Sequence, residues 1–318
     1  MKKFSAALLT VTLLFLTACG ATPPATKTDG EDLTPVKVGV IEITDAAAAY
    51  VGVEQGFFEE EGLDVELVPS QGGAAIIPLV VSGGADFGFS NVTSLIIGRS
   101  QGLPLQIVAA GNATTGIEGE DFADVLVKDD SGIEDAGDLV GKTIAVNTLN
   151  NISDTTVRAA AEAAGENPSE VTFVEMPFPD MQAALVEGNV DAVATVEPFR
   201  SIMLEDNMRS AVSNYATPLT DLMVTAYFTS EQMTAQKPEV VEAFKRAMSR
   251  SLEYSDENPD AVREILPKFT ALDAEMVNKI VLPRFPSEIN RDSVNEVAEL
   301  ALKNDLIDEL PDMEKFIP

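Results

Sequence analysis

Several residue types that support common enzyme chemistry are missing from this sequence. Its 318 residues include no His, no Trp and a single Cys. Without His, a Ser-His-Asp or Cys-His catalytic arrangement and the usual His-containing zinc sites are excluded. One Cys cannot form an internal disulfide or a CxxC redox pair. We therefore expect no enzyme activity, no cofactor and no metal site.

Positive charge is also scarce, because 21 Lys and Arg stand against 52 Asp and Glu, for a formal net charge of -31. Nucleic-acid binding depends on cations that neutralise phosphates, so we expect no DNA or RNA partner. The same charge disfavours binding to a membrane through a polybasic surface. A hydrophobic content of 45% indicates a folded globular protein, and the length favours two core-forming units over one.

The N-terminus has the order of a secretory signal peptide. Two lysines precede an apolar run over residues 6–16, which is too short for a membrane-spanning helix of about 20 residues. The run ends in Leu16-Thr17-Ala18-Cys19, which resembles a bacterial lipobox and implies cleavage before Cys19 and acylation of its thiol. An ordinary buried cysteine in a core helix is the alternative. We predict a lipoprotein signal peptide over residues 1–18.

The segment after Cys19 contains almost nothing to bury. Residues 19–35 are polar and rich in Pro, and this composition predicts a flexible tether. With a lipid (palmitate) anchor at Cys19, the tether would place the folded part at the outer face of the bacterial cytoplasmic membrane, but not in the membrane.

From residue 36 onward, short apolar runs alternate with helical patterns. This order predicts an α/β fold with largely parallel strand pairing. The expected strands are 36–43, 65–68, 87–89, 106–110, 125–127, 143–146, 171–174, 192–196 and 223–228. The expected helices are 46–60, 74–81, 93–101, 154–164, 179–187 and 199–207, and the chain from residue 231 to the end is expected to be almost wholly helical.

Two segments of the sequence repeat one pattern. Residues 79–89 and 184–194 each combine a helix end, a Gly stop, an Asp and an apolar strand. This spacing is too long for a solenoid repeat and fits two similar lobes. A common helix-to-strand turn used twice by chance is the alternative. We expect the first lobe over residues 36–111 and 230–318, and the second lobe over residues 112–229.

Small polar residues follow several expected strands, at the edge where open α/β sheets bind ligands. Thr44 and Asp45 follow the first strand, residues 90–94 follow the third, and residues 147–154 follow the sixth. Any one of these residues could equally be an N-cap that stabilises a helix by about 1 kcal/mol. Their recurrence in both halves favours a ligand-binding cleft between the lobes.

Other candidate contacts are a carboxylate and two aromatic rings. Glu197 ends an expected strand just before Pro198, where it could cap the next helix or accept a hydrogen bond from a ligand. Phe178 and Tyr50 could stack on a ligand ring or belong to the core. Residues 111–116 could cross between lobes or form a surface loop.

Four motifs together resemble one family of transport proteins. They are residues 50–68, 82–88 and 138–146, and residues 187–192 with Glu197-Pro198-Phe199. In this order they resemble ABC-transporter substrate-binding proteins of the nitrate/sulfonate/taurine/thiamine-pyrimidine-precursor group (NitT/TauT, SsuA/NMT1-like). The resemblance covers roughly residues 36–228, whereas each motif alone is weak.

The resemblance implies a two-lobed type II periplasmic-binding fold that closes on a small ligand, and we expect the protein to be a monomer. It also implies delivery of this ligand to an ABC permease with its ATPase subunit. By position in the motifs, the expected ligand contacts are Asp45, Ser90, Asn91, Asn112, Thr148, Asn150 and Glu197. We add Thr114, and Tyr50 and Phe178 as stacking side chains.

The ligand class follows from which side chains are present. Nitrate and bicarbonate binders of this group use His, Lys and Trp around the anion, so the absence of His and Trp disfavours that branch. Asp45 and Glu197 would repel an oxyanion and suit a ligand with N–H donors. We therefore favour a nitrogen heterocycle such as a pyrimidine-like thiamine precursor. An alkanesulfonate held by helix N-termini is the other candidate.

Two other classes of function remain open. One is an enzyme on the same fold, either like chorismate dehydratase or like the yeast-type pyrimidine synthase, although the latter needs a His and a Cys-rich motif that this chain lacks. The other is a surface interaction lipoprotein without a small ligand.

Overall fold

The computed structural model describes residues 33–270 and 272–318. The predicted signal peptide, the predicted acylation site at Cys19 and the tether up to residue 32 lie outside the described residues. The last residues of the expected tether belong to the fold, since β1 (Thr34–Val40) begins at Thr34, whose N–H donates to the Gly62 carbonyl at 2.8 Å. None of the helices in the described ranges is both long and apolar enough to cross a membrane.

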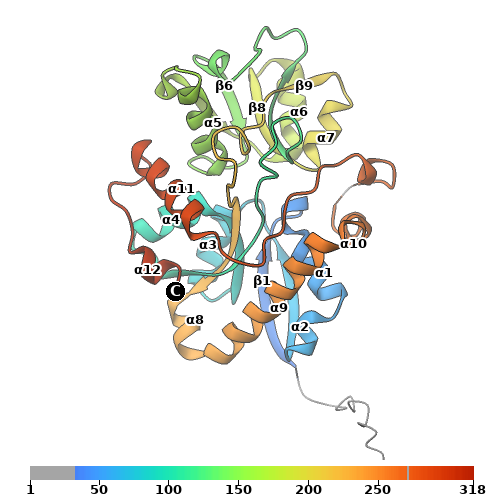
Figure 1. Cartoon of the computed structure of the whole chain (residues 1–318), viewed down its shortest axis with the longest axis vertical. Coiled ribbons are helices and arrows are strands. Elements are labelled where there is room, and N and C mark those ends of the chain that lie inside the picture. Colours follow the sequence, from blue (N-terminus) through green and yellow to red (C-terminus); the bar gives the residue numbers. More distant parts are fainter. Residues whose placement is uncertain (1–32, 271) are drawn as a thin grey trace, which may run out of the picture. The chain divides into compact units, whose positions relative to one another are not determined.

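The first sheet has five strands in the order β2-β1-β3-β10-β4. Its strands β1 and β2 pair in parallel, as do β1 and β3, whereas β10 is antiparallel to both of its neighbours. The other strands are β2 (Leu63–Pro69), β3 (Phe87–Asn91), β4 (Leu105–Ala110) and β10 (Thr225–Ser230). With its helices, this sheet is the first lobe, which occupies the lower part of Figure 1.

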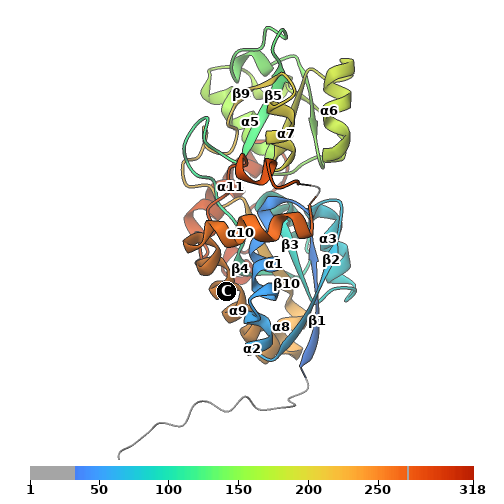
Figure 2. The ribbon, with the colours of Figure 1, turned by 90° about the vertical axis from the view of Figure 1, so that its right-hand side faces the viewer.

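The second sheet repeats the same arrangement in the order β7-β6-β8-β5-β9. Here β6 pairs in parallel with β7 and β8, and β5 is antiparallel to β8 and β9. Its strands are β5 (Ala123–Lys128), β6 (Thr143–Val146), β7 (Thr172–Glu175), β8 (Ala192–Val196) and β9 (Met208–Val212). This sheet and its helices form the second lobe, shown from the side in the upper part of Figure 2.

Helices cover both sheets. Those of the second lobe are α5 (Ile152–Ala163), α6 (Phe178–Glu187) and α7 (Phe199–Leu204). Those of the first lobe are α1 (Ala47–Glu54), α2 (Phe57–Glu60), α3 (Gly73–Val81), α4 (Val92–Ser100), α8 (Glu231–Gln236), α9 (Pro238–Glu257), α10 (Pro259–Ile265), α11 (Arg291–Lys303) and α12 (Met313–Phe316).

The predicted α/β fold with two lobes is confirmed, but the prediction of largely parallel pairing is wrong. One strand in each sheet, β10 or β5, lies between two antiparallel neighbours. Both strands enter their sheet directly after the chain has crossed from the other lobe, so no βαβ crossover fixes their direction. Residues 225–229, expected in the second lobe, therefore lie in β10 of the first sheet.

Three other expectations about the elements differ from the structure. The expected helix over 46–60 is two helices, because Gly56 takes a left-handed φ of 75° between them. Strand β9 was not expected. The C-terminal region is not wholly helical, since residues 279–290 contain no helix and only a short 3-10 turn, Met276–Asn278, precedes them.

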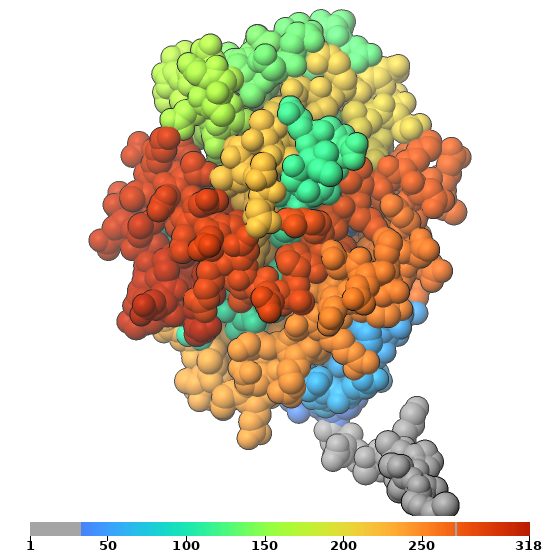
Figure 3. Space-filling model, in the orientation of Figure 1, coloured from blue at the N-terminus to red at the C-terminus, as the bar shows by residue number. Residues whose placement is uncertain are grey.

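Three segments of the chain meet between the lobes. Residues 111–122 lead from β4 to β5, and residues 213–224 lead back from β9 to β10. A third segment, residues 276–285, is called the strap below. Ala113 forms isolated β-bridges to Met223 of the return segment and to Arg284 of the strap. On the face shown in Figure 3 the strap and the two crossing segments lie side by side.

A cluster of aromatic rings joins the first sheet to α9. Phe87 on β3 stacks on Phe244 of α9 with ring centroids 3.8 Å apart, and both rings are fully buried. Phe58 and Tyr227 pack around the same ring of Phe244. The ring of Phe244 therefore holds α9 against the sheet.

We predict that Phe244→Ala lowers the free energy of unfolding by about 3–5 kcal/mol, because it removes a buried aromatic side chain and leaves a cavity. Chemical denaturation of the two proteins measures this difference. Val53→Ala, at a side chain on α1 that is 40% exposed, is the control and should change the value by less than about 0.5 kcal/mol. Equal effects of the two substitutions would contradict this account of the core.

Candidate functional site

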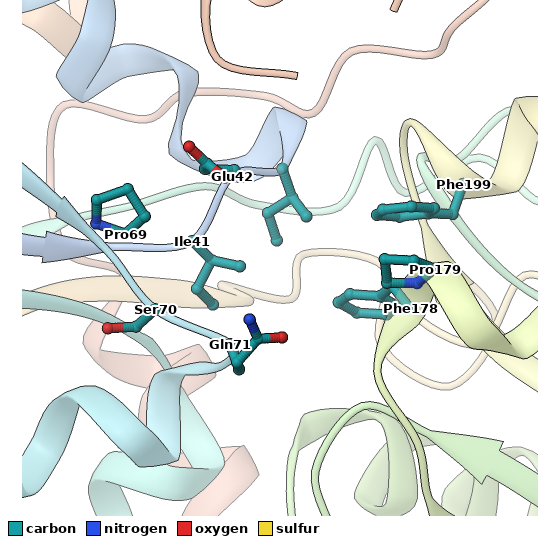
Figure 4. Close-up of a pocket in the computed structure, with 9 residues that line it drawn as sticks. Ile41, Glu42, Pro69, Ser70, Gln71, Phe178, Pro179 and Phe199 are labelled. Carbon is teal, nitrogen blue, oxygen red and sulfur yellow. The ribbon is translucent and has the colours of Figure 1, made fainter. Parts of the chain in front are cut away.

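A cavity of about 300 Å³ lies between the two lobes. The first lobe contributes the residues that directly follow β1 and β2, and the second lobe contributes the starts of α6 and α7. Because parallel strands β1 and β2 are neighbours, their carboxyl ends meet at one edge of the sheet. The lining residues, drawn in Figure 4, are Ile41, Glu42, Ile43, Pro69, Ser70, Gln71, Phe178, Pro179 and Phe199.

Two stacked phenyl rings form the second-lobe wall of this cavity. The rings of Phe178 and Phe199 have centroids 5.5 Å apart and an interplanar angle of 15°. Prolines set the starts of both helices, since Pro179 stands in the first turn of α6 and Pro198 directly precedes α7. The two stacked rings are thus presented from neighbouring helix starts, with their edges toward the first-lobe side of the cavity (Figure 4).

The opposite wall combines the apolar residues Ile41, Ile43 and Pro69 with three polar side chains, Glu42, Ser70 and Gln71. Figure 4 shows Ile41 and the Gln71 amide projecting toward the phenyl rings, whereas the Glu42 carboxylate points away from them. No Lys or Arg is among the residues that line the cavity. The cavity therefore offers an aromatic wall, an opposite wall of mixed polarity with an amide that can donate and accept hydrogen bonds, and no cation for an anionic group.

The structure places one of the ten predicted ligand contacts, Phe178, in the wall of this cavity. The others have positions and partners of their own, given below, and their role as ligand contacts remains a prediction. Sequence reasoning missed Ile41, Ile43, Pro69, Gln71 and Phe199 as lining residues. Their positions in the sequence could have indicated this role, because they lie at the carboxyl ends of β1 and β2 and in the Glu197-Pro198-Phe199 motif.

Asp45 and Asn112 are buried between the lobes. Oδ1 of Asp45 and Nδ2 of Asn112 lack hydrogen-bond partners among the described residues. Burial raises the pKa of Asp45 from its ordinary 3.8 to about 7, and the charges of Asp121 and Glu197 contribute to this rise. Asp45 is therefore an acid that titrates near neutral pH inside the protein.

Threonine hydroxyls fasten the first crossing segment internally and to the start of β10. Thr114 Oγ1 donates to Asp121 Oδ2 at 2.6 Å, and Thr225 Oγ1 donates to Asn112 Oδ1 at 2.6 Å. All four side chains are buried. These bonds give Asn112 and Thr114 a structural role at the junction of the lobes.

The remaining polar predictions include helix caps and residues near helix starts. Asn91 caps α4, since its Oδ1 accepts from the Ser94 N–H at 2.8 Å. Asn150 is exposed with a left-handed φ of 55°, and its N–H donates to Asp154 Oδ2 at 2.7 Å. Thr148 is half-buried, and Ser90 is fully buried at the end of β3. The N-cap alternative is thus correct for Asn91.

Tyr50 stacks on another protein ring. Its centroid lies 3.7 Å from that of Phe269, with the two rings nearly parallel. Burial, together with the nearby charge of Glu42, raises the pKa of Tyr50 to about 12. This ring packs against the core of the first lobe rather than lining the cavity.

Glu197 has a fully buried carboxylate at the end of β8. Its Oε1 accepts from Ser201 Oγ at 2.8 Å, from the Val281 N–H at 3.2 Å and from Arg200 Nη1 at 3.3 Å. Its Oε2 accepts from the Ser201 N–H at 3.2 Å. Burial raises the pKa of Glu197, while these donors and the Arg200 charge lower it.

Comparison with known proteins identifies related chains. A family model described as "NMT1/THI5 like" matches residues 43–262. The formylaminopyrimidine-binding protein of Halalkalibacterium halodurans is 28% identical over 273 residues, which cover 84% of this chain and 79% of the relative. The 4-amino-5-hydroxymethyl-2-methylpyrimidine phosphate synthase of Aspergillus parasiticus is 23% identical, with 78% of this chain and 74% of the relative covered.

The fold also matches a solved structure. The alkanesulfonate-binding protein SsuA from Xanthomonas axonopodis pv. citri, bound to MOPS, superposes with a TM-score of 0.76 at 14% identity. The match covers 91% of this chain and 99% of that protein. The likeness shows the fold.

We predict that Asp45→Asn stabilises the protein more at pH 8 than at pH 5. A raised native pKa makes the native state bind more protons, so wild-type stability is lost as the pH rises from about 4 through about 7. At 1.36 kcal/mol per pH unit, the advantage of the variant should grow by roughly 2–3 kcal/mol between the two pH values.

Urea unfolding at pH 5 and pH 8 measures this difference. Asp64→Asn is the matched control, because it removes the same charge from an exposed residue on β2. If the difference in free energy of unfolding between Asp45→Asn and wild type were the same at both pH values, the raised pKa of the buried Asp45 carboxyl group would be contradicted.

Proposed function

The chain belongs to the NMT1/THI5-like family, and from this premise we propose that it is an extracytoplasmic solute-binding protein of an ABC importer. It captures a small, flat, nitrogen-containing organic molecule between its lobes and delivers this solute to a permease with its ATPase subunit. The monomer is held at the membrane by a lipid on Cys19.

One observation carries this proposal, namely the cavity wall formed by Phe178 and Phe199 opposite the aliphatic residues of the first lobe. A flat ring fits between these two walls, and an aromatic contact with the phenyl rings supplies about 0.5–1.5 kcal/mol beyond the hydrophobic term. The Gln71 amide can then pair with a ring nitrogen or an amino group at the edge of the solute.

The charge of the cavity favours one of the two candidate ligands. An alkanesulfonate carries a full negative charge, and neither Lys nor Arg lines the cavity. The formal charge of -31 adds an unfavourable overall field. A neutral or protonated nitrogen heterocycle needs no cation in the cavity and is not repelled by the negative charge of the protein. The relative that binds formylaminopyrimidine supports the same choice.

An enzyme is the second candidate, because one relative is a pyrimidine phosphate synthase. The chain has no His and one Cys, so it lacks the His and the Cys-rich motif on which that synthase chemistry depends. We therefore propose binding without turnover.

We predict that Phe199→Ala weakens binding of the pyrimidine 4-amino-5-hydroxymethyl-2-methylpyrimidine about tenfold, because it removes one of the two stacked rings. Isothermal titration calorimetry measures the affinity. Phe269→Ala is the matched control, since it removes a ring that stacks on Tyr50 outside the cavity, and it should leave the affinity unchanged.

A wider thermal-shift panel tests the class of solute. A solute at about 100 times its dissociation constant stabilises the native state by about 2.7 kcal/mol. Stabilisation by pyrimidines and not by ethanesulfonate is the expected result. Stabilisation by ethanesulfonate alone would overturn the ligand class, and no stabilisation by any solute would favour an interaction lipoprotein.

A further inference from the structure

Glu197 contacts both walls of the cavity region without lining the cavity itself. It lies two residues before Phe199 of the aromatic wall. Its backbone carbonyl accepts from the N–H of Thr44, the residue after Ile43 of the opposite wall, at 3.3 Å. This hydrogen bond joins the second lobe to the first lobe directly beside the cavity.

The carboxylate of Glu197 makes a second connection, to the strap. Oε1 accepts from the Val281 N–H at 3.2 Å, although Val281 is separated from Glu197 by 84 positions in the sequence. The strap is in turn bound to both crossing segments, because Ala113 pairs with Arg284 and Arg284 bonds to Asp221 at 2.7 Å. Glu197 thus ties the start of α7 to the segments that connect the lobes.

The same carboxylate has little capacity left for a ligand. Oε1 has three donors and Oε2 has one, and the side chain has no exposed surface. A carboxylate has about four lone-pair positions, so internal donors account for its usual hydrogen bonds. A direct contact with solute would require the lobe-to-strap bond or the bond to Ser201 to break first.

Buried partners fix the orientation of this carboxylate. Arg200 Nε donates to Asp124 Oδ2 on β5 at 2.6 Å, while its Nη1 donates to Glu197. Asp124 Oδ1 accepts from Ser213 Oγ at 2.7 Å, and Ser213 Oγ accepts from the Gly119 N–H at 2.9 Å. The network therefore extends from Glu197 into both crossing segments.

We infer that Glu197 is a positioning residue that holds the two walls of the cavity at a fixed separation and favours the closed cleft, without contacting the solute. This inference rests on the proposed function of the cleft in solute capture. In an open cleft the Val281 N–H and the Glu197 carboxylate would separate and be hydrated. The bond therefore stabilises the closed cleft by the difference between its own free energy and that of this hydration.

The test is the distance between the lobes in the protein without solute. Spin labels are attached at Asp64→Cys on the first lobe and Asp130→Cys on the second lobe, both exposed, in the mature chain carrying Cys19→Ser. Electron paramagnetic resonance then gives the distance distribution. We expect Glu197→Gln to raise the ratio of open to closed protein about threefold to tenfold.

Two further variants make the result specific. Asp191→Asn is the matched control, because Asp191 Oδ2 accepts from the Thr143 N–H at 2.8 Å within the second lobe alone, and it should leave the distribution unchanged. Ser201→Ala removes only a hydroxyl donor to Glu197 and should shift the distribution in the same direction by less. It serves as the test if Glu197→Gln does not fold.

Separate outcomes test the inference and the proposed function. An unchanged distribution in folded Glu197→Gln, or in Ser201→Ala where the first variant does not fold, would overturn the inference. If affinity for the pyrimidine also fell in that case, Glu197 would be a ligand contact. Failure of every solute to bind wild-type protein would remove the proposed function and leave the distance measurement on the empty protein valid.

Discussion

Arg200 of α7 binds two buried carboxylates of the second lobe, one on β5 and one directly after β8. Its guanidinium lies 2.6 Å from Asp124 and 3.3 Å from Glu197, and it is the one buried cation among the described residues. Transfer of such ions out of water costs several kcal/mol each, and this cost is offset only when all partners are in place. The positions of β5, β8 and the start of α7 are therefore fixed together.

The position of the cavity follows from this constraint. The start of α7 carries Phe199, whose ring stacks on Phe178 from α6, and the ends of β1 and β2 form the opposite wall. The wall residues come from separate lobes, so the cavity exists only at a certain separation of the lobes. Ligand capture and lobe closure are thus properties of the same few contacts, which is the usual logic of a hinged binding protein.

The fold was largely readable from the sequence because buried strands are continuous apolar runs. Residues 143–146 and 192–196 were predicted with the bounds that β6 and β8 have. The direction of β5 and β10 was not readable, since it depends on where the chain returns after crossing between the lobes. Strand β9 was missed because Arg209 and Ser210 interrupt its apolar pattern.

The site was less predictable than the fold. Polar residues after strands were expected to contact ligand, and Asn91 shows why such residues are ambiguous in the sequence, because the same side chains satisfy the free N–H groups of a helix start. Phe178 was found from its place between two prolines. Gln71 and Ile41 carry no signal of their own, since their role depends on which strand ends become neighbours in the folded sheet.

The structure of the protein in complex with a solute that stabilises it would test the central claim most directly. We expect the solute to contact the stacked rings of Phe178 and Phe199, to face Ile41 and Ile43, and to leave the bond from Val281 to Glu197 intact. A solute bound elsewhere would contradict it, for example in the surface groove beside α9 that Arg246 and Arg250 line.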